Sequence, residues 1–100
     1  MLWLLVKVEK FPRSYRLTVG ERLSVVSLDL LLRLVDASYS QHKREPLAAA
    51  STQVNAIRFL LRIARDLKLL PQAGHLYAAE RLDEIGRLVG GWRRSAAVSS

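Results

Sequence analysis

The spacing of apolar residues is the feature that most constrains the fold of this chain. Along most of the sequence they recur at steps of three and four, which is the period of one face of an α-helix. The clearest row contains Val19, Leu23, Val26, Leu30, Leu34 and Ala37. A face of this kind belongs in a core, and 100 residues suffice for one modest core. We therefore expect a single all-α domain.

A proline divides the first part of this pattern. Pro12 forbids a continuous helix through its position, so a short first helix over residues 2–10 ends before it. Ser14 can cap a second helix, and Thr18 with Glu21 offers a capping box one turn later. Both starting points stay open on the sequence alone.

Two further breaks separate the remaining helices. Residues 41–45 are polar, and Pro46 suits the first turn of a third helix over about 47–70. Pro71 marks the next turn, and a fourth helix follows over about 74–94. Because the connections are short, each helix should run antiparallel to the one before it.

The predicted architecture is an antiparallel up-down four-helix bundle whose first helix is short. We assign the bundle to residues 1–94 as one domain. Residues 95–100 are mostly small and polar, so we expect a flexible C-terminal tail there.

The second helix carries more apolar surface than one core requires. Beside the row given above runs a second one, made of Val25, Leu28, Leu32, Val35 and Tyr39. In a small bundle one apolar stripe per helix is enough, so the second row predicts either a central helix or a subunit interface. We favour the subunit interface.

Three glycines interrupt an otherwise good fourth helix. Gly86, Gly90 and Gly91 should each cost up to about 1 kcal/mol relative to alanine, which indicates close helix approach at this point. For Gly90 and Gly91 the end of the helix is an alternative explanation. Trp92 continues the apolar stripe of the same helix and is predicted to pack in the bundle.

The charge balance favours a polyanionic partner. Sixteen basic residues, twelve of them arginine, outweigh nine acidic ones and leave a formal charge of +7. Arginine pairs bidentately with phosphate, although solubilising surface charge is the simpler alternative. The chain has no cysteine, which fits a reducing cytoplasm. Its longest apolar stretch, residues 23–35, is too short for a membrane span of about 20 residues, so we expect a soluble cytoplasmic protein that does not bind membranes.

The position of the arginines decides between these alternatives. Arg58, Arg62 and Arg65 fall in steps of three and four opposite the apolar seam of the third helix, so they should share one exposed face. Like charges at this spacing repel one another unless a polyanion lies across them. The other basic clusters lie at chain turns and helix ends, and contain Arg13, Arg16, Lys43, Arg44, Arg93 and Arg94. Together they predict nucleic-acid binding through phosphate contacts, with little sequence preference and a steep salt dependence.

The acidic and histidine residues do not suggest an enzyme. On the fourth helix Asp83 and Arg87 are spaced as an ordinary i,i+4 pair, and Glu80 and Glu84 lie among basic residues. His42 and His75 are near turns, with no carboxylate cluster at metal-ligand spacing. We therefore expect no catalysis, no metal and no cofactor.

Three stretches of the chain carry a family resemblance. They are Lys10-Phe11-Pro12-Arg13-Ser14 with Arg16, Thr18, Gly20 and Arg22 after it, Leu60-Leu61-Arg62-Ile63-Ala64-Arg65-Asp66-Leu67, and Asp83-Glu84-Ile85-Gly86-Arg87-Leu88-Val89-Gly90-Gly91-Trp92. With the helical pattern, they resemble the accessory variability determinant (Avd) family of diversity-generating retroelements. The Gly-Arg-x-x-Gly-Gly-Trp ending is the most specific part, and the resemblance extends from residue 3 to 94.

This resemblance implies a homopentameric barrel of four-helix subunits. It also implies binding to the reverse transcriptase of the retroelement and to RNA or DNA, in support of mutagenic cDNA synthesis and without catalysis. Members usually have a longer first helix than the segment before Pro12 allows, and a helix that short is marginal alone. The alternatives are a bundle of the ribosomal RNA intervening-sequence type and a basic membrane-surface protein.

Overall fold

The computed structural model describes residues 2–99, with side chains through residue 96, and these residues form four helices. The first is α1 (Leu2–Glu9). The second is a continuous helical run made of α2 (Arg13–Tyr15), the π-helical turn η1 (Arg16–Gly20) and α3 (Glu21–Tyr39). The third and fourth are α4 (Arg44–Asp66) and α5 (Gln72–Ser99). No strand occurs among the described residues, so the all-α prediction is confirmed.

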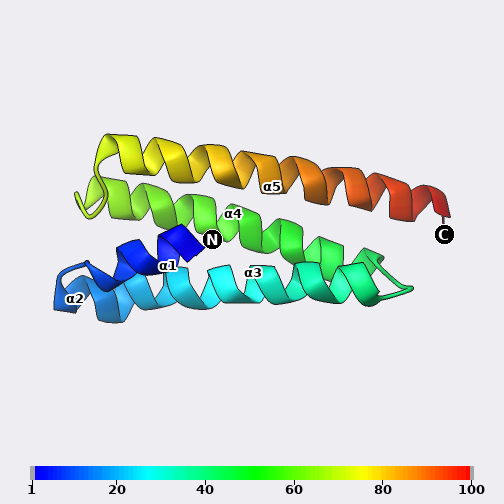
Figure 1. Cartoon of the computed structure of the whole chain (residues 1–100), viewed down its shortest axis with the longest axis horizontal. Helices are drawn as coiled ribbons and strands as arrows, with labels where there is room; N and C mark the ends of the chain where they lie inside the picture. The colour runs from blue at the N-terminus through cyan, green and yellow to red at the C-terminus, as the bar shows by residue number, and fades with distance from the viewer. Residues whose placement is uncertain (1, 100) are drawn as a thin grey trace.

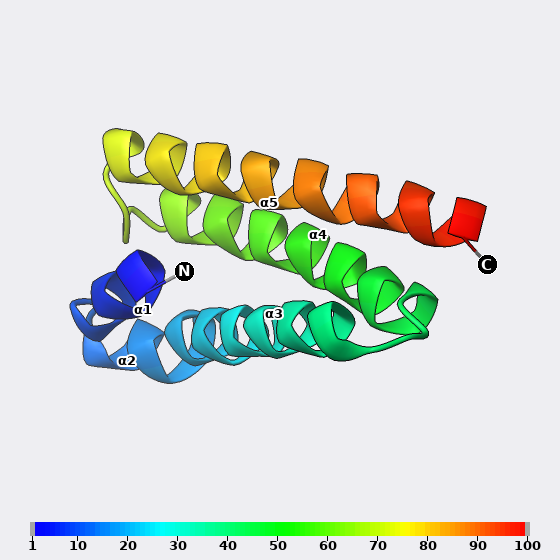
Figure 2. The ribbon, with the colours of Figure 1, turned by 45° about the vertical axis from the view of Figure 1, so that its right-hand side comes forward.

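The helices alternate in direction along an elongated body of 46 × 22 × 17 Å. The middle helix is α4, which packs against α3 on one side and α5 on the other in the two largest helix–helix contacts (Figures 1 and 2). The short helix α1 lies beside η1 and the beginning of α3, and it does not reach the other end of the bundle. The bundle is therefore complete at one end only.

The core consists of the residues that the three-four spacing selects. From α3 and α4, Leu23, Leu30, Ile57 and Leu61 are almost fully buried, and Val89 of α5 joins them. Burying one such side chain contributes about 1.5–3 kcal/mol. Trp92 is half-buried and packs against this core, as its place in the α5 stripe predicts.

The second helical run begins without either of the predicted side-chain caps. Pro12 occupies the N-cap position with ψ of 145°, and the helix starts at Arg13. Ser14 thus lies inside the first turn, where it cannot cap. The hydroxyl of Thr18 donates to the carbonyl oxygen of Ser14, one turn earlier, at 3.2 Å, so it does not cap a helix start at Thr18. Both capping predictions are wrong because proline, which lacks an N–H and fixes φ, sets the start.

Gly20, the last residue of η1, is a point of close approach between the second helical run and the end of α1. It is buried, and a Cβ atom there would lie 2.9 Å from Cγ1 of Val8 and 3.3 Å from Cδ2 of Phe11. Real Cβ atoms hardly ever come that close to a neighbour. The end of α1 and the residue before Pro12 therefore pack directly on the helix backbone at this position.

The third helix ends four residues before its predicted limit of about 70. Lys68 has a positive φ of 61°, while the N–H of Leu69 donates to Ala64 O and that of Lys68 to Arg65 O. This is the Schellman arrangement, which usually has glycine where Lys68 stands. Pro71 marks the turn but stands several residues beyond Asp66, and no glycine occupies the end of the helix, so the sequence did not indicate where α4 stops.

The fourth helix is longer than predicted at both ends. It begins at Gln72, directly after Pro71, and its backbone is helical through Ser99 instead of ending near residue 94. Ser100, the last residue of the predicted tail, lies outside the described residues. The flexibility of residues 95–100 stays a prediction.

The second apolar row of α3 lies on the surface of the subunit. Leu28, Leu32 and Val35 are about half exposed or more, and Tyr39 is 87% exposed. The central-helix alternative is therefore wrong, because α4 takes that position. The subunit interface stays a prediction.

Candidate nucleic-acid interface

The arginine stripe of α4 lies beside α5. The sequence placed Arg58, Arg62 and Arg65 opposite the apolar seam, but Arg58 reaches across to the neighbouring helix. Its Nη1 donates to Oδ1 of Asp83 at 2.5 Å, and its Nη2 lies 3.1 Å from the point where a Cβ atom on Gly86 would sit. We call the line where the two helices meet the α4–α5 seam.

A groove of about 460 Å³ opens on this seam around Gly86 and Gly90. Three guanidinium side chains line it, those of Arg58, Arg87 and Arg94. The guanidinium of Arg94 folds back along its own helix, with Nη1 3.6 Å from a Cβ position on Gly90. The missing glycine side chains thus leave room for guanidinium groups beside the α5 backbone.

The seam continues as a second basic hollow next to the α4–α5 turn. Arg65, Lys68 and His75 line this hollow, whose volume is about 800 Å³. Burial lowers the pKa of His75, and the positive charges of Arg65 and Arg62 lower it further, while Asp66 opposes them. The lowered pKa of His75 therefore reflects, in part, the positive potential of this part of the seam.

The other two arginines of the stripe have only weak partners within the chain. Arg65 Nε lies 3.4 Å from Oδ1 of Asp66, and both side chains are largely exposed. The guanidinium of Arg62 lies 5.8 Å from the ring centroid of Phe59, an exposed aromatic residue. Exposed pairs of this kind contribute little, so both guanidinium groups stay available to an outside anion.

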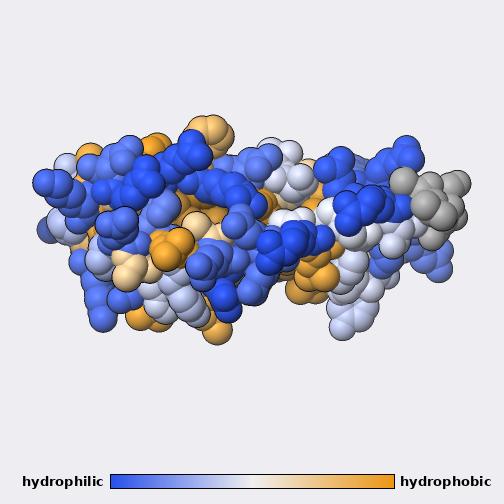
Figure 3. Space-filling model, turned by 90° about the horizontal axis from the view of Figure 1, so that it is seen from above, coloured by the Kyte–Doolittle hydropathy of each residue, from blue (hydrophilic) through white to orange (hydrophobic). Residues whose placement is uncertain are grey.

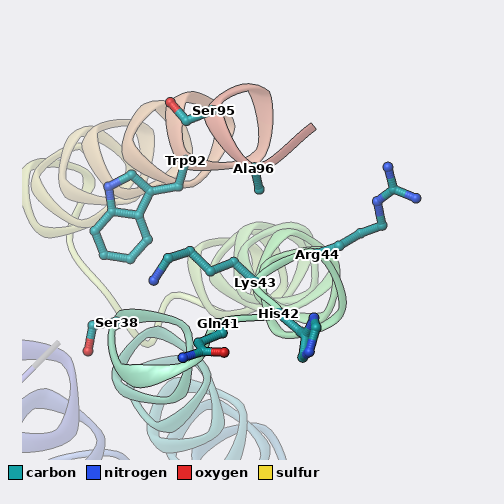
Figure 4. Close-up of a pocket in the computed structure, with 8 residues that line it drawn as sticks. All are labelled: Ser38, Gln41, His42, Lys43, Arg44, Trp92, Ser95 and Ala96. Carbon is teal, nitrogen blue, oxygen red and sulfur yellow. The ribbon is translucent and has the colours of Figure 1, made fainter. Parts of the chain in front are cut away.

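A third hollow lies at the open end of the bundle, between the ends of α3 and α5 (Figure 4). Its volume is about 720 Å³, and the indole of Trp92 points into it from α5. Lys43 also reaches into this space, but its Nζ donates to the carbonyl oxygen of Ala37, near the end of α3. Arg44 points outward instead. The predicted Lys43 and Arg44 cluster is therefore divided between a structural and an exposed role.

The remaining predicted basic residues do not join one site. Arg13 and Arg16 are exposed on α2 and η1, at the end of the bundle opposite the C-terminal end of α5 (Figure 1). Arg93 is exposed near that C-terminal end, beside Arg94. The structure thus gathers Arg58 and Arg94 around one groove, and separates Arg13 and Arg16 from it.

Two basic residues of the seam were missing from the sequence prediction. Arg87 lines the groove, and Asp83, its expected partner, is paired with Arg58 of the neighbouring helix instead. Lys68 lines the second hollow from the Schellman turn. The position of Arg87 next to Gly86 was the available signal for the first, whereas nothing in the local sequence indicated the second.

Two of the three acidic residues of α5, Asp83 and Glu84, are engaged in pairs. Glu84 lies 3.1 Å from Arg81 on its own helix, and Asp83 is held by Arg58. Among the described residues, no three histidine, aspartate or glutamate side chains gather as metal ligands would. The arrangement on this face is suited to anion binding through guanidinium groups.

The surface over α5 has a mixed character. Seen from this side, hydrophilic residues cover much of the molecule, and hydrophobic residues lie between them (Figure 3). None of the helices in the described part of the chain combines the length and the apolar character that crossing a membrane requires.

A family model described as bAvd-like matches residues 1–96. No curated protein and no solved structure matches the chain.

Proposed function

The chain belongs to the bAvd-like family, and from this membership we propose that it is a non-catalytic accessory protein of a diversity-generating retroelement. In this role it binds RNA or DNA along the α4–α5 seam, together with the reverse transcriptase, and supports mutagenic cDNA synthesis in the cytoplasm. The convergence of Arg58, Arg87 and Arg94 on one groove is the observation that carries the nucleic-acid part of the proposal.

The electrostatics of the seam support this assignment. Guanidinium groups bind phosphate in a fixed fork, and a protein that neutralises several phosphates releases their counterions. The seam presents such groups at intervals along α4 and α5, from Arg94 past Arg58 to Arg65. A single strand lying along it would meet a basic side chain at each helical turn or two.

Equilibrium binding to a fluorescent single-stranded RNA tests the proposal. We compare two double variants that both lower the formal charge from +7 to +3, namely R62E/R65E on the seam and R22E/R33E on α3. The seam variant should lose about two phosphate contacts, which reduces the salt slope by about 1.4 and weakens binding by one to two orders of magnitude near 0.1 M salt. Equal losses in both variants, or no loss in either, would contradict the seam assignment.

The reverse transcriptase is the second proposed partner. Co-expression of the chain with the enzyme encoded beside it should yield a complex on affinity purification. The complex should survive a salt concentration that removes RNA, because a protein interface depends less on counterion release than a phosphate contact does. Loss of the complex after nuclease treatment would mean that RNA alone bridges the two proteins.

We also propose that the subunits assemble into a ring. Besides the α3 row, a separate apolar face is exposed by Phe59 and Ile63 of α4 and by Leu67, directly after this helix. Two different apolar faces on one subunit suit a head-to-tail contact, which closes into a ring when the rotation allows. The family resemblance implies five subunits.

The mass in solution tests this ring. Five chains of 11.3 kDa give about 56 kDa by light scattering. Leu32→Glu puts a charge into the α3 row and should lower the mass, whereas Leu88→Glu on α5 should leave it unchanged. A wild-type mass of 11 kDa at micromolar concentration would refute the assembly.

A further inference from the structure

The groove around Gly86 has the features of a specific phosphate site, and its residues differ in what they already bind. Arg58 is paired with Asp83, whereas Arg87 and Arg94 line the groove without sharing that carboxylate. Three positive charges thus face one negative charge. Ser51 and Asn55 line the same groove and can add uncharged hydrogen bonds to an anion.

The Arg58–Asp83 pair is the contact that an incoming anion would replace. The two side chains are 42% and 48% exposed, and a pair so exposed is weak because water screens it. Only Nη1 of Arg58 contacts the carboxylate, while Nη2 lies over Gly86. The guanidinium of Arg58 therefore uses only part of its hydrogen-bond donors on Asp83.

Glycine at position 86 leaves room for this position of Arg58. A Cβ atom there would lie 3.1 Å from Nη2, which is tighter than most real Cβ contacts, so the guanidinium would have to shift by a few tenths of an ångström. The other neighbour of that point, Cγ1 of Val54, is at an ordinary 3.8 Å. An alanine would thus crowd the guanidinium and shift it off the α5 backbone, while leaving the helix packing largely unchanged.

We propose that this groove binds a phosphodiester group of a nucleic-acid backbone, and that the phosphate displaces the Asp83 carboxylate from Arg58. Asp83 then acts as an internal competitor, which holds Arg58 in place when the groove is empty and lowers the affinity for weak anions. A phosphate oxygen can accept from Arg58 and from Arg87 or Arg94, which a single carboxylate does not do here. This inference rests on the proposed nucleic-acid binding and assigns it a central contact.

Two charge variants and one glycine variant test whether Asp83 competes with the phosphate for Arg58. Asp83→Asn should increase the affinity for a 12-nucleotide single-stranded RNA by about five- to tenfold at 0.1 M salt, because it frees Arg58. Glu84→Gln makes the same change in charge, but its partner Arg81 lies outside the groove, so its effect should be less than twofold. Gly86→Ala should weaken binding by about three- to tenfold with unchanged circular dichroism.

The possible outcomes distinguish failure of the phosphate site in the groove from failure of the proposed nucleic-acid binding. If the wild-type chain binds the RNA but Asp83→Asn matches Glu84→Gln and Gly86→Ala binds as wild type, the groove proposal is overturned and the seam assignment survives. If the wild-type chain binds no RNA, the proposed function fails as well. Titration with inorganic phosphate distinguishes a nucleic-acid phosphate from a free anion. If millimolar phosphate produces at Arg58 a response as large as that to the RNA, or larger, the groove is a free-anion site and the nucleic-acid assignment is overturned.

Discussion

Replacing Gly20 with alanine tests how closely α1 is docked on the bundle. The added methyl group would lie 2.9 Å from Val8 Cγ1 and 3.3 Å from Phe11 Cδ2, and both neighbours are buried. Overpacking of this kind costs about 1–3 kcal/mol. Alanine recovers up to about 1 kcal/mol through its higher helix propensity. We expect a net loss of about 1–2 kcal/mol in the free energy of unfolding.

Gly91 provides the matched control on the same chain. A Cβ atom there would meet only Nη2 of Arg94, at 3.9 Å, which is an ordinary contact with a flexible side chain. Gly91→Ala should therefore gain up to about 1 kcal/mol through helix propensity alone. The two substitutions add the same methyl group, and the different stabilities that we expect come from what surrounds it.

Urea denaturation followed by circular dichroism measures both variants. The protein concentration must be the same in every sample, since assembly of the chain would make the midpoint concentration-dependent. In a thermal scan, 1 kcal/mol corresponds to a shift of about 4–8 °C for a domain of this size. A Gly20→Ala variant as stable as Gly91→Ala would refute the docking of α1 on η1.

Two further predictions follow from the turn after α4 and the hollow beside it. Lys68→Gly should raise the melting temperature, because relief of the left-handed conformation is worth about 1 kcal/mol; a lower melting temperature would contradict the Schellman turn. The lowered pKa of His75 means that protonation favours the unfolded chain, so the free energy of unfolding should increase as pH rises towards about 6.5. His75→Gln should flatten that increase in pH-dependent urea titrations, and an unchanged slope would exclude His75 as its source.

The sequence predicted the buried faces better than the neighbours of each helix. Periodicity places Leu23, Leu30, Ile57 and Leu61 in a core, and all four are buried. Periodicity does not state which helix lies opposite, so it could not reveal that α4 is the middle helix. The two apolar rows of α3 therefore admitted a central position that the structure excludes.

The candidate site was predictable in kind but not in detail. Steps of three and four along one helix bring Arg58, Arg62 and Arg65 together without any knowledge of the fold. The pairing of Arg58 with Asp83 joins residues 25 positions apart. The alternative partner of Asp83, Arg87 on the same helix, had the usual i,i+4 spacing for a pair. Such a choice depends on the side-by-side packing of α4 and α5, which no local pattern contains.

The middle position of α4 also bears on how the chain folds. Its two large contacts are with α3 and α5, the elements directly before and after it, so each can form as a local helical hairpin. Both hairpins need the same helix, and a core substitution such as Ile57→Ala should slow folding as well as weaken the native state. Loss of α1 contacts, by contrast, should mainly speed local opening at one end, since α1 has no part in either hairpin.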